Sequence, residues 1–279
     1  MTTPPRRSKS TTSVGLRRDM LDAVALLLTQ ARSVLVITGP ALSADSGIQM
    51  YRGLPGLVRK KPEDGKLIEL AMSADTLAQK PGMTWKYLLE MDEHVRGAQP
   101  NRGHEFIAAL EQQLQRTVVM TINVDRLHQR AGSRNVIEMH GELHDLLCQR
   151  CEISQRTSGF HRMDIPPLCK ACGSVLRPDM PLFGEALPAD PFTRLQAELD
   201  AGFDLVMSIG INTMFPYIAR PILVAKSEGI PTVEICAGHT DVSDVVDFRF
   251  RGTPMRVLDL IWDAYRQLPR DTQPPYESR

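Results

Sequence analysis

The sequence lacks an excess of charge of either sign, and it lacks long apolar runs. Its 279 residues include 33 basic and 33 acidic side chains, so the formal net charge is zero. A balanced surface offers no long-range field to phosphate backbones, which disfavours nucleic acid as the main partner. The richest apolar runs, Val34–Thr38 and Leu205–Ile209, have the length of single strands. A membrane-spanning helix needs ~20 apolar residues, so no membrane span is predicted.

A secretory leader is also missing, because residues 1–20 contain no apolar core segment. Disulfides are therefore not expected, and we expect a reducing, cytoplasmic setting instead. Residues 1–15 have no apolar periodicity and predict a disordered tail. Their Arg/Ser/Thr-rich composition also suits an organelle transit peptide, so organelle targeting stays open. Residues 269–279, rich in Pro and polar side chains, predict a flexible C-terminus.

Apolar patterning predicts helices that alternate with short buried strands. Helical spacing of apolar residues occurs at 17–31, 105–115 and 216–228. Continuous apolar runs of strand length occur at 34–38, 117–121, 136–139, 204–209 and 232–235. This alternation predicts an α/β fold, with a mostly parallel sheet covered by helices on both faces.

Two segments interrupt the alternation. Residues 53–103 are rich in Gly, Pro, Lys and Met with a broken helical pattern, which predicts a helical insertion or a flexible lid. Residues 142–180 contain four of the five cysteines and few apolar side chains, which predicts a small metal-held module. The expectation is one domain over 16–279 with these two segments inserted.

Four cysteines stand in two CxxC pairs, Cys148/Cys151 and Cys169/Cys172, with seventeen residues between the pairs. This spacing fits tetrahedral zinc, and four protein ligands leave no open position, so the metal is expected to be structural. A redox CxxC or four unrelated thiols are the alternatives. The fifth cysteine, Cys236, follows a predicted strand and is expected to be a buried small residue.

Polar residues follow several predicted strands at the sheet edge where open α/β sheets bind ligands. A run of small residues, Gly39–Gly47, follows the first strand and could let backbone N–H groups approach a diphosphate. Asn123 and Asp125, then His140, follow two further strands. Taken singly, His140 could be a structural histidine, and the other two could cap the next helix. Their shared edge makes them candidate site residues.

From about Val34 to Gly252 the chain resembles the sirtuins, a family of NAD-dependent protein deacylases. The resemblance rests on ordered matches that include both CxxC pairs and the following segments: Ser43–Ile48, Tyr51–Gly53, Pro100–His104, Thr121–Asp125, Leu127–His128, Ala131–Gly132, His140–Gly141, Leu176–Asp179 and Phe183–Pro188. It implies a Rossmann-like domain that binds NAD, beside a small inserted zinc-ribbon and helical module. An acylated lysine of a protein substrate would enter between the two.

The resemblance also implies roles for single residues. His140 would be the general base on the ribose hydroxyls, a task suited to an imidazole. Asn123 would hold the ribose or a water molecule, and Asp125 would contact the nicotinamide carboxamide. Arg52 would reach the phosphates, and Tyr51 would shield the reactive carbon.

The predicted site therefore has four sets of residues. The catalytic set is His140, Asn123, Asp125 and Arg52. The cofactor-binding set is Gly39, Ala41, Ser43, Asp45, Tyr51, Arg52, Ile122, Asn123, Asp125, Gly210, Ile211, Asn212 and Cys236. The substrate-binding set is Met180, Pro181, Leu182, Phe183 and Gly184. The metal set is Cys148, Cys151, Cys169 and Cys172.

The chain departs from the family pattern in the cofactor pocket. Ala41 replaces a glycine, Ile122 a glutamine, Ile211 a threonine and Cys236 an asparagine. Two or three lost polar contacts, at roughly 0.5–1.5 kcal/mol each, could weaken NAD binding by about one to three powers of ten. Pro181 changes the strand edge that pairs with the substrate peptide, because proline has no N–H to donate.

The predicted function is an NAD-dependent protein-lysine deacylase that transfers the acyl group to ADP-ribose and releases nicotinamide. One alternative is a sirtuin fold that senses NAD, ADP-ribose or a related nucleotide without turnover. Another is a specialised NAD-hydrolysing or ADP-ribosyl-transferring enzyme. The acyl chain, the protein substrate and the oligomeric state stay open at this stage.

Overall fold

A computed structural model describes residues 17–51, 54–55, 64–211 and 215–268. The predicted tail at 1–15 and the C-terminal segment at 269–279 lie outside these residues. So do the predicted site residues Arg52 and Asn212.

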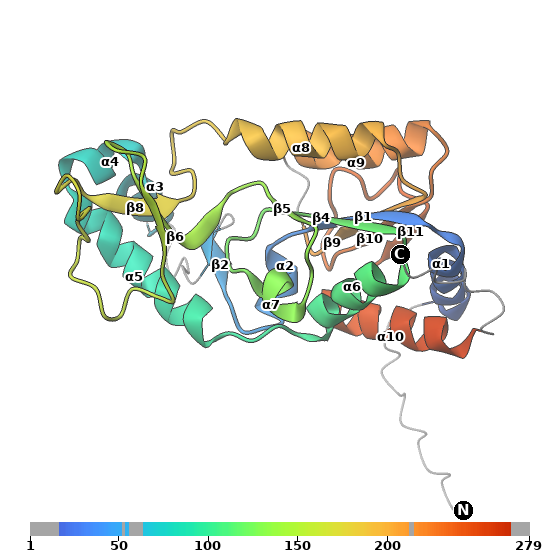
Figure 1. The fold of residues 1–279 in the computed structure, drawn as a ribbon. Helices are drawn as coiled ribbons and strands as arrows, with labels where there is room; N and C mark the ends of the chain where they lie inside the picture. Colours follow the sequence, from blue (N-terminus) through green and yellow to red (C-terminus); the bar gives the residue numbers. More distant parts are fainter. Residues whose placement is uncertain (1–16, 52–53, 56–63, 212–214, 269–279) are drawn as a thin grey trace, which may run out of the picture.

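A six-stranded parallel sheet forms the centre of the larger part of the molecule (Figure 1). Its strands, in spatial order, are β11 (Phe248–Phe250), β10 (Thr232–Ile235), β9 (Leu205–Ile209), β1 (Ser33–Thr38), β4 (Arg116–Thr121) and β5 (Val136–Glu138). Every neighbouring pair is parallel. Along the chain, β4 and β5 follow on one side of β1, and β9, β10 and β11 then follow on its other side. The strand order therefore reverses beside β1. A crevice for a ligand is expected at that point.

Helices cover both faces of the sheet because its strands are apolar on both sides. One face packs against α1 (Arg18–Gln30), α6 (Arg102–Gln113) and α10 (Pro254–Gln267), and the other against α8 (Ala189–Asp200) and α9 (Pro216–Ser227) (Figure 1). The α/β fold expected from the alternation is thereby confirmed. Helix α6 begins three residues before the predicted start at 105, because the Asn101 side chain caps it by accepting from the Gly103 and His104 amides.

A smaller part lies at the end of the molecule away from α1 (Figure 1). It contains α3 (Asp64–Ala71), α4 (Ala74–Gln79) and α5 (Pro81–Gly97), and an antiparallel sheet of β7 (Ser154–Arg156), β6 (Glu142–Cys148) and β8 (Leu176–Asp179). Trp85 of α5 is fully buried and donates its indole N–H to the Leu176 carbonyl at 3.0 Å. His144 of β6 bonds to Asp92 of α5 at 2.8 Å. These contacts join the helices to the small sheet in one separate core.

Three short elements lie between β1 and α3 along the chain: α2 (Pro40–Ala44), β2 (Met50–Tyr51) and β3 (Leu54–Pro55). A further short helix, α7 (Leu127–Ala131), lies between β4 and β5. Among the helices of the described residues, none combines the length and apolar character needed to cross a membrane.

Candidate functional site

The turn after β1 packs closely against the end of β9. Gly210 has a φ of 63°, and a Cβ at this position would lie 2.8 Å from the Leu42 amide nitrogen. A Cβ on Gly39 would lie 2.7 Å from the Cβ of Ile211. Both positions therefore require glycine. The Ala41 N–H already donates to the Gly210 carbonyl at 2.9 Å, so this turn uses one of its donors internally.

Three predicted site residues form one buried hydrogen-bonded group, which we call the Ser43 network: Ser43, Asn123 and Asp125. The Ser43 hydroxyl donates to Asp125 Oδ2 at 2.5 Å, and Asn123 Nδ2 donates to Ser43 Oγ at 2.9 Å. Asn123 Nδ2 also donates to the Gly39 carbonyl at 3.1 Å. The network thus ties the end of β4 to the turn after β1. Asn123 Oδ1 is buried without a partner within the described protein, which suits an acceptor for a bound ligand.

Burial and hydrogen bonds act in opposite directions on the pKa of the Asp125 carboxyl. The side chain is deeply buried, and this raises the carboxyl pKa, while the Ser43 hydroxyl and the Leu127 amide act in the opposite direction. The Leu127 N–H donates to Asp125 Oδ1 at 3.0 Å, so both carboxyl oxygens have a donor. A buried carboxyl held at both oxygens is fixed in direction before any ligand binds.

A second set of polar residues links β1 and α2 to α7 and to the start of α6. Thr38 Oγ1 and His128 Nε2 lie 2.8 Å apart, and the His104 ring meets the His128 ring edge to face at 4.9 Å. Asn101 Nδ2 donates to the Leu42 carbonyl at 2.7 Å, which holds α2 against α6. Sequence patterns gave these residues no role, although three of them lie in the segments that resemble the sirtuins. The Asn101–Leu42 and Thr38–His128 contacts span 59 and 90 residues of chain, so no local pattern predicts these two contacts.

His140 follows β5 and faces the space between the two parts. Its Nε2 lies 2.7 Å from the Tyr217 hydroxyl of α9. Burial lowers the imidazole pKa to about 4, and a hydrogen bond with the Ile122 backbone acts against this shift. The imidazole is therefore neutral near pH 7, as a general base must be. Gly141 is required next, because its φ is 64° and a Cβ there would lie 1.9 Å from the Asp179 carbonyl oxygen of β8.

A cavity of about 280 Å³ opens beside His140. Its walls come from both parts of the molecule and are mostly apolar. All five predicted substrate residues line it, together with these side chains: Met72, Val124, His140, Glu185, Leu187, Phe215 and Tyr217. The structure therefore brings the predicted base and the predicted substrate-binding segment to one space.

The segment Met180–Glu185, which lines the cavity, is held by an ion pair between Arg177 and Glu185. The sequence patterns did not predict this pair. The two terminal nitrogens of the Arg177 guanidinium, Nη1 and Nη2, donate to the Glu185 carboxylate at 2.5 and 2.7 Å. Arg177 Nη2 also donates to the Met180 carbonyl at 2.7 Å. The Glu185 carboxylate accepts from the Leu182 amide at 2.7 Å. The Phe183 amide donates to the Met72 carbonyl at 2.9 Å, so the segment is also attached to the helices.

Other predicted cofactor residues surround the turn or lie behind it. Ile122 and Ile211 are buried in the core between the sheet and α8 and α9. The Asp45 carboxylate accepts from the Met255 amide at 2.9 Å, in the first turn of α10. Cys236 follows β10, and its amide donates to the Phe250 carbonyl at 3.1 Å. The Tyr51 side chain lies outside the described atoms. Their cofactor roles stay predictions.

The four paired cysteines converge on one point in the small sheet. Their sulfur atoms all lie within 4.8 Å of one another, and adjacent pairs are 3.3 to 3.5 Å apart. Tetrahedral zinc with Zn–S bonds of about 2.3 Å places its sulfur ligands about 3.8 Å apart, so the arrangement fits one zinc ion. All four ligands come from the protein, which makes this a structural site. Cys236 lies outside the cluster.

Comparison with known proteins is consistent with this geometry. The model of the Sir2 family matches residues 39–214. The chain is 43% identical to NAD-dependent protein deacylase 2 of Pseudomonas aeruginosa, over 85% of this chain and 93% of that protein. It is 35% identical to NAD-dependent protein deacylase 1 of Archaeoglobus fulgidus, over 83% and 92% of the two chains.

Solved structures show the same likeness. A Sir2 homologue in complex with NAD superposes with a TM-score of 0.78 and 31% identity, covering 88% of this chain and 94% of the other. A variant Sir2 homologue in complex with 2′-O-acetyl ADP-ribose superposes with a TM-score of 0.77 and 32% identity, covering 88% and 96%.

Proposed function

The chain belongs to the Sir2 family, and from that premise we propose that it is an NAD-dependent protein-lysine deacylase. It transfers the acyl group of a modified lysine to ADP-ribose and releases nicotinamide. The observation that carries the proposal is the shared cavity, where neutral His140 meets the segment Met180–Gly184. Its acylated protein substrate belongs to the class acted on by the deacylases that the chain resembles.

The residues at the sheet edge fit NAD. Asn123 Oδ1 offers a buried acceptor with no partner among the described residues, and the same side chain bonds to the Gly39 carbonyl in the turn after β1. We assign the Ser43 network to the nicotinamide ribose and carboxamide, and the turn after β1 to the diphosphate. When bound, NAD supplies ADP-ribose as the acyl acceptor and nicotinamide as the leaving group.

The chain's own side chains perform three tasks in this account. His140 Nε2 accepts a proton from a ribose hydroxyl of NAD. The low pKa of His140 permits this near pH 7, because the ring is then unprotonated. The Ser43 network keeps Asn123 and Asp125 in fixed directions, so little reorganisation is needed on binding. The apolar wall of the cavity keeps water from the acyl group.

The test is nicotinamide release from NAD, measured with and without an acetylated lysine peptide. The proposal predicts release only when the peptide is present. His140→Ala is expected to lower the rate by about 10²–10⁴, the usual contribution of a general base. His94→Ala, at an exposed position on α5, is the matched control and is expected to keep the full rate.

Peptide-independent release would instead assign the chain to NAD hydrolysis. No release at millimolar NAD would indicate a binding protein. Full turnover by His140→Ala would refute His140 as the base.

A further inference from the structure

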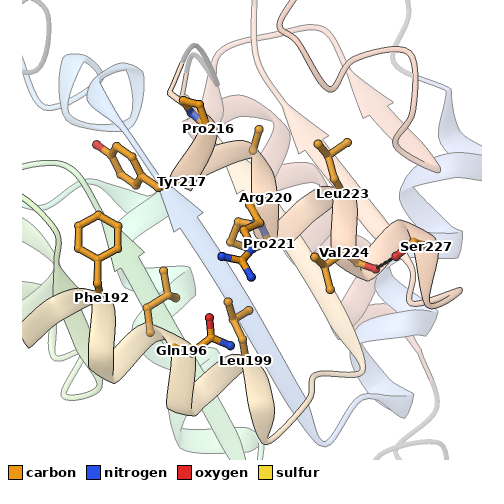
Figure 2. A pocket seen from close by; sticks show the side chains of 12 residues that line it. Phe192, Gln196, Leu199, Pro216, Tyr217, Arg220, Pro221, Leu223, Val224 and Ser227 are labelled. Carbon is orange, nitrogen blue, oxygen red and sulfur yellow. Dashed lines mark hydrogen bonds between the residues drawn. The ribbon is translucent and has the colours of Figure 1, made fainter. Parts of the chain in front are cut away.

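Tyr217 contacts His140 although sequence reasoning gave it no role. It is the second residue of α9, and its hydroxyl lies 2.7 Å from His140 Nε2. Its ring lines the 280 Å³ cavity and also the end of a groove of about 650 Å³ between α8 and α9. Figure 2 shows its hydroxyl directed away from Arg220, which lies further along that groove.

Aromatic neighbours hold the Tyr217 ring independently of its hydroxyl. Phe192 of α8 meets the ring edge to face at 5.4 Å, and Phe215 stacks on it at 5.8 Å with an interplanar angle of 20°. Edge-to-face and stacked pairs of this kind stabilise a ring position beyond the effect of the area they bury. A phenylalanine at position 217 would therefore keep the ring in place and remove only the hydroxyl.

The hydrogen bonds around His140 define which ring nitrogen carries the proton. The bond with the Ile122 backbone raises the His140 pKa, so the ring is the donor in that bond. A neutral imidazole has one N–H, so Nε2 bears the lone pair and accepts from the Tyr217 hydroxyl. Burial raises the pKa of Tyr217 to about 12, which keeps the phenol protonated and able to donate.

We propose that Tyr217 is a positioning residue for the reaction. Its hydroxyl holds His140 with the Nε2 lone pair directed to the cavity, and it gives up this place when a substrate hydroxyl binds. The proposal rests on the proposed function, in which His140 Nε2 is the proton acceptor. Tyr217 itself carries no proton between substrate and solvent. Its effect is on the direction and tautomer of the His140 ring.

Tyr217→Phe tests the proposal in the full chain. The expected result is a fall of about tenfold in kcat/KM for NAD with little change in kcat, because the contact orders the His140 ring only until a substrate hydroxyl replaces it. Tyr265→Phe is the matched control, because Tyr265 also stacks on an aromatic ring, Trp262 at 5.3 Å, but lies on α10 away from the cavity. It is expected to leave kcat/KM for NAD unchanged.

A second readout does not need turnover. In nitrogen-15 NMR of the resting protein near pH 7, His140 is expected to show one tautomer, with an unprotonated Nε2 that accepts a hydrogen bond. Tyr217→Phe is expected to move this Nε2 signal downfield, since the nitrogen loses its donor. An Nε2 signal that does not move would overturn the proposal.

The kinetic outcomes are equally decisive. A kcat loss as large as that of His140→Ala would contradict positioning and make Tyr217 a proton carrier. A change of less than twofold in kcat/KM for NAD in Tyr217→Phe would also overturn the proposal. If the wild-type protein releases no nicotinamide at all, the proposed function fails, while the NMR result still decides the Tyr217–His140 contact.

Discussion

Replacing Ser43 by Ala removes the centre of the Ser43 network. The Ser43 side chain is fully buried, donates to Asp125 Oδ2 and accepts from Asn123 Nδ2. In the variant, Asp125 Oδ2 keeps no donor among its recorded hydrogen bonds. Asn123 Nδ2 keeps only the Gly39 carbonyl as acceptor.

The size of the effect follows from these contacts. A hydrogen bond to a charged group contributes about 1.5–3 kcal/mol, and leaving a buried acceptor unsatisfied costs a similar amount. We expect Ser43→Ala to lower the free energy of unfolding by about 2–3 kcal/mol. For a domain of this size, that corresponds to a Tm lower by about 4–12 °C. The pKa of Asp125 is expected to rise further, because the Ser43 hydroxyl is one of the groups that lower it.

Ser133→Ala is the matched control. Ser133 is also buried, but its hydroxyl has no hydrogen-bond partner among the described residues. Removing it is expected to change the free energy of unfolding by less than about 0.5 kcal/mol. Denaturant titrations of both variants at pH 7.5 measure the difference. Equal losses in the two variants would refute the view that the Ser43 network fixes Asn123 and Asp125.

Two further predictions concern the metal and the pH. Cys169→Ser is expected to abolish zinc binding measured by atomic absorption, whereas Cys236→Ser keeps one zinc per chain; zinc retained in the first would contradict the four-ligand site. Burial lowers the His104 pKa to about 4. The unfolded chain therefore binds more protons below pH 6.5, and this contribution to stability falls as the pH drops, by about 2 kcal/mol at pH 5. Denaturant titrations at pH 7.5 and 5 measure this change in the free energy of unfolding. An equal fall in His104→Gln and in the wild-type protein would contradict the assignment to His104.

Five of the six strands of the large sheet were predicted because they are buried on both faces, whereas β11 (Phe248–Phe250) was not predicted. Val34–Thr38 is apolar at almost every position, and a segment of that length has little choice but a covered parallel strand. The strands β6, β7 and β8 were not predicted. They are short, partly polar and arranged around the four cysteines, so a metal site and not an apolar pattern determines them.

The candidate site also contains residues that the sequence predicted and residues that it did not. Asn123, Asp125 and His140 were predictable because each follows a buried strand, and parallel strands end at one edge. Tyr217 and the Arg177–Glu185 pair were not assigned roles. Tyr217 reaches His140 across 77 residues of chain. The Arg177–Glu185 pair acts on backbone groups that no sequence pattern identifies: Arg177 donates to the Met180 carbonyl, and Glu185 accepts from the Leu182 amide.

The most direct test of the account is the stoichiometry of one reaction. Purified protein is given NAD and an acetylated lysine peptide, and released nicotinamide and deacetylated peptide are measured in the same samples. The account predicts equal amounts of the two products at every time point, and neither product when NAD or the acetyl group is omitted. Nicotinamide formed without deacetylation, or deacetylation without NAD, would contradict it.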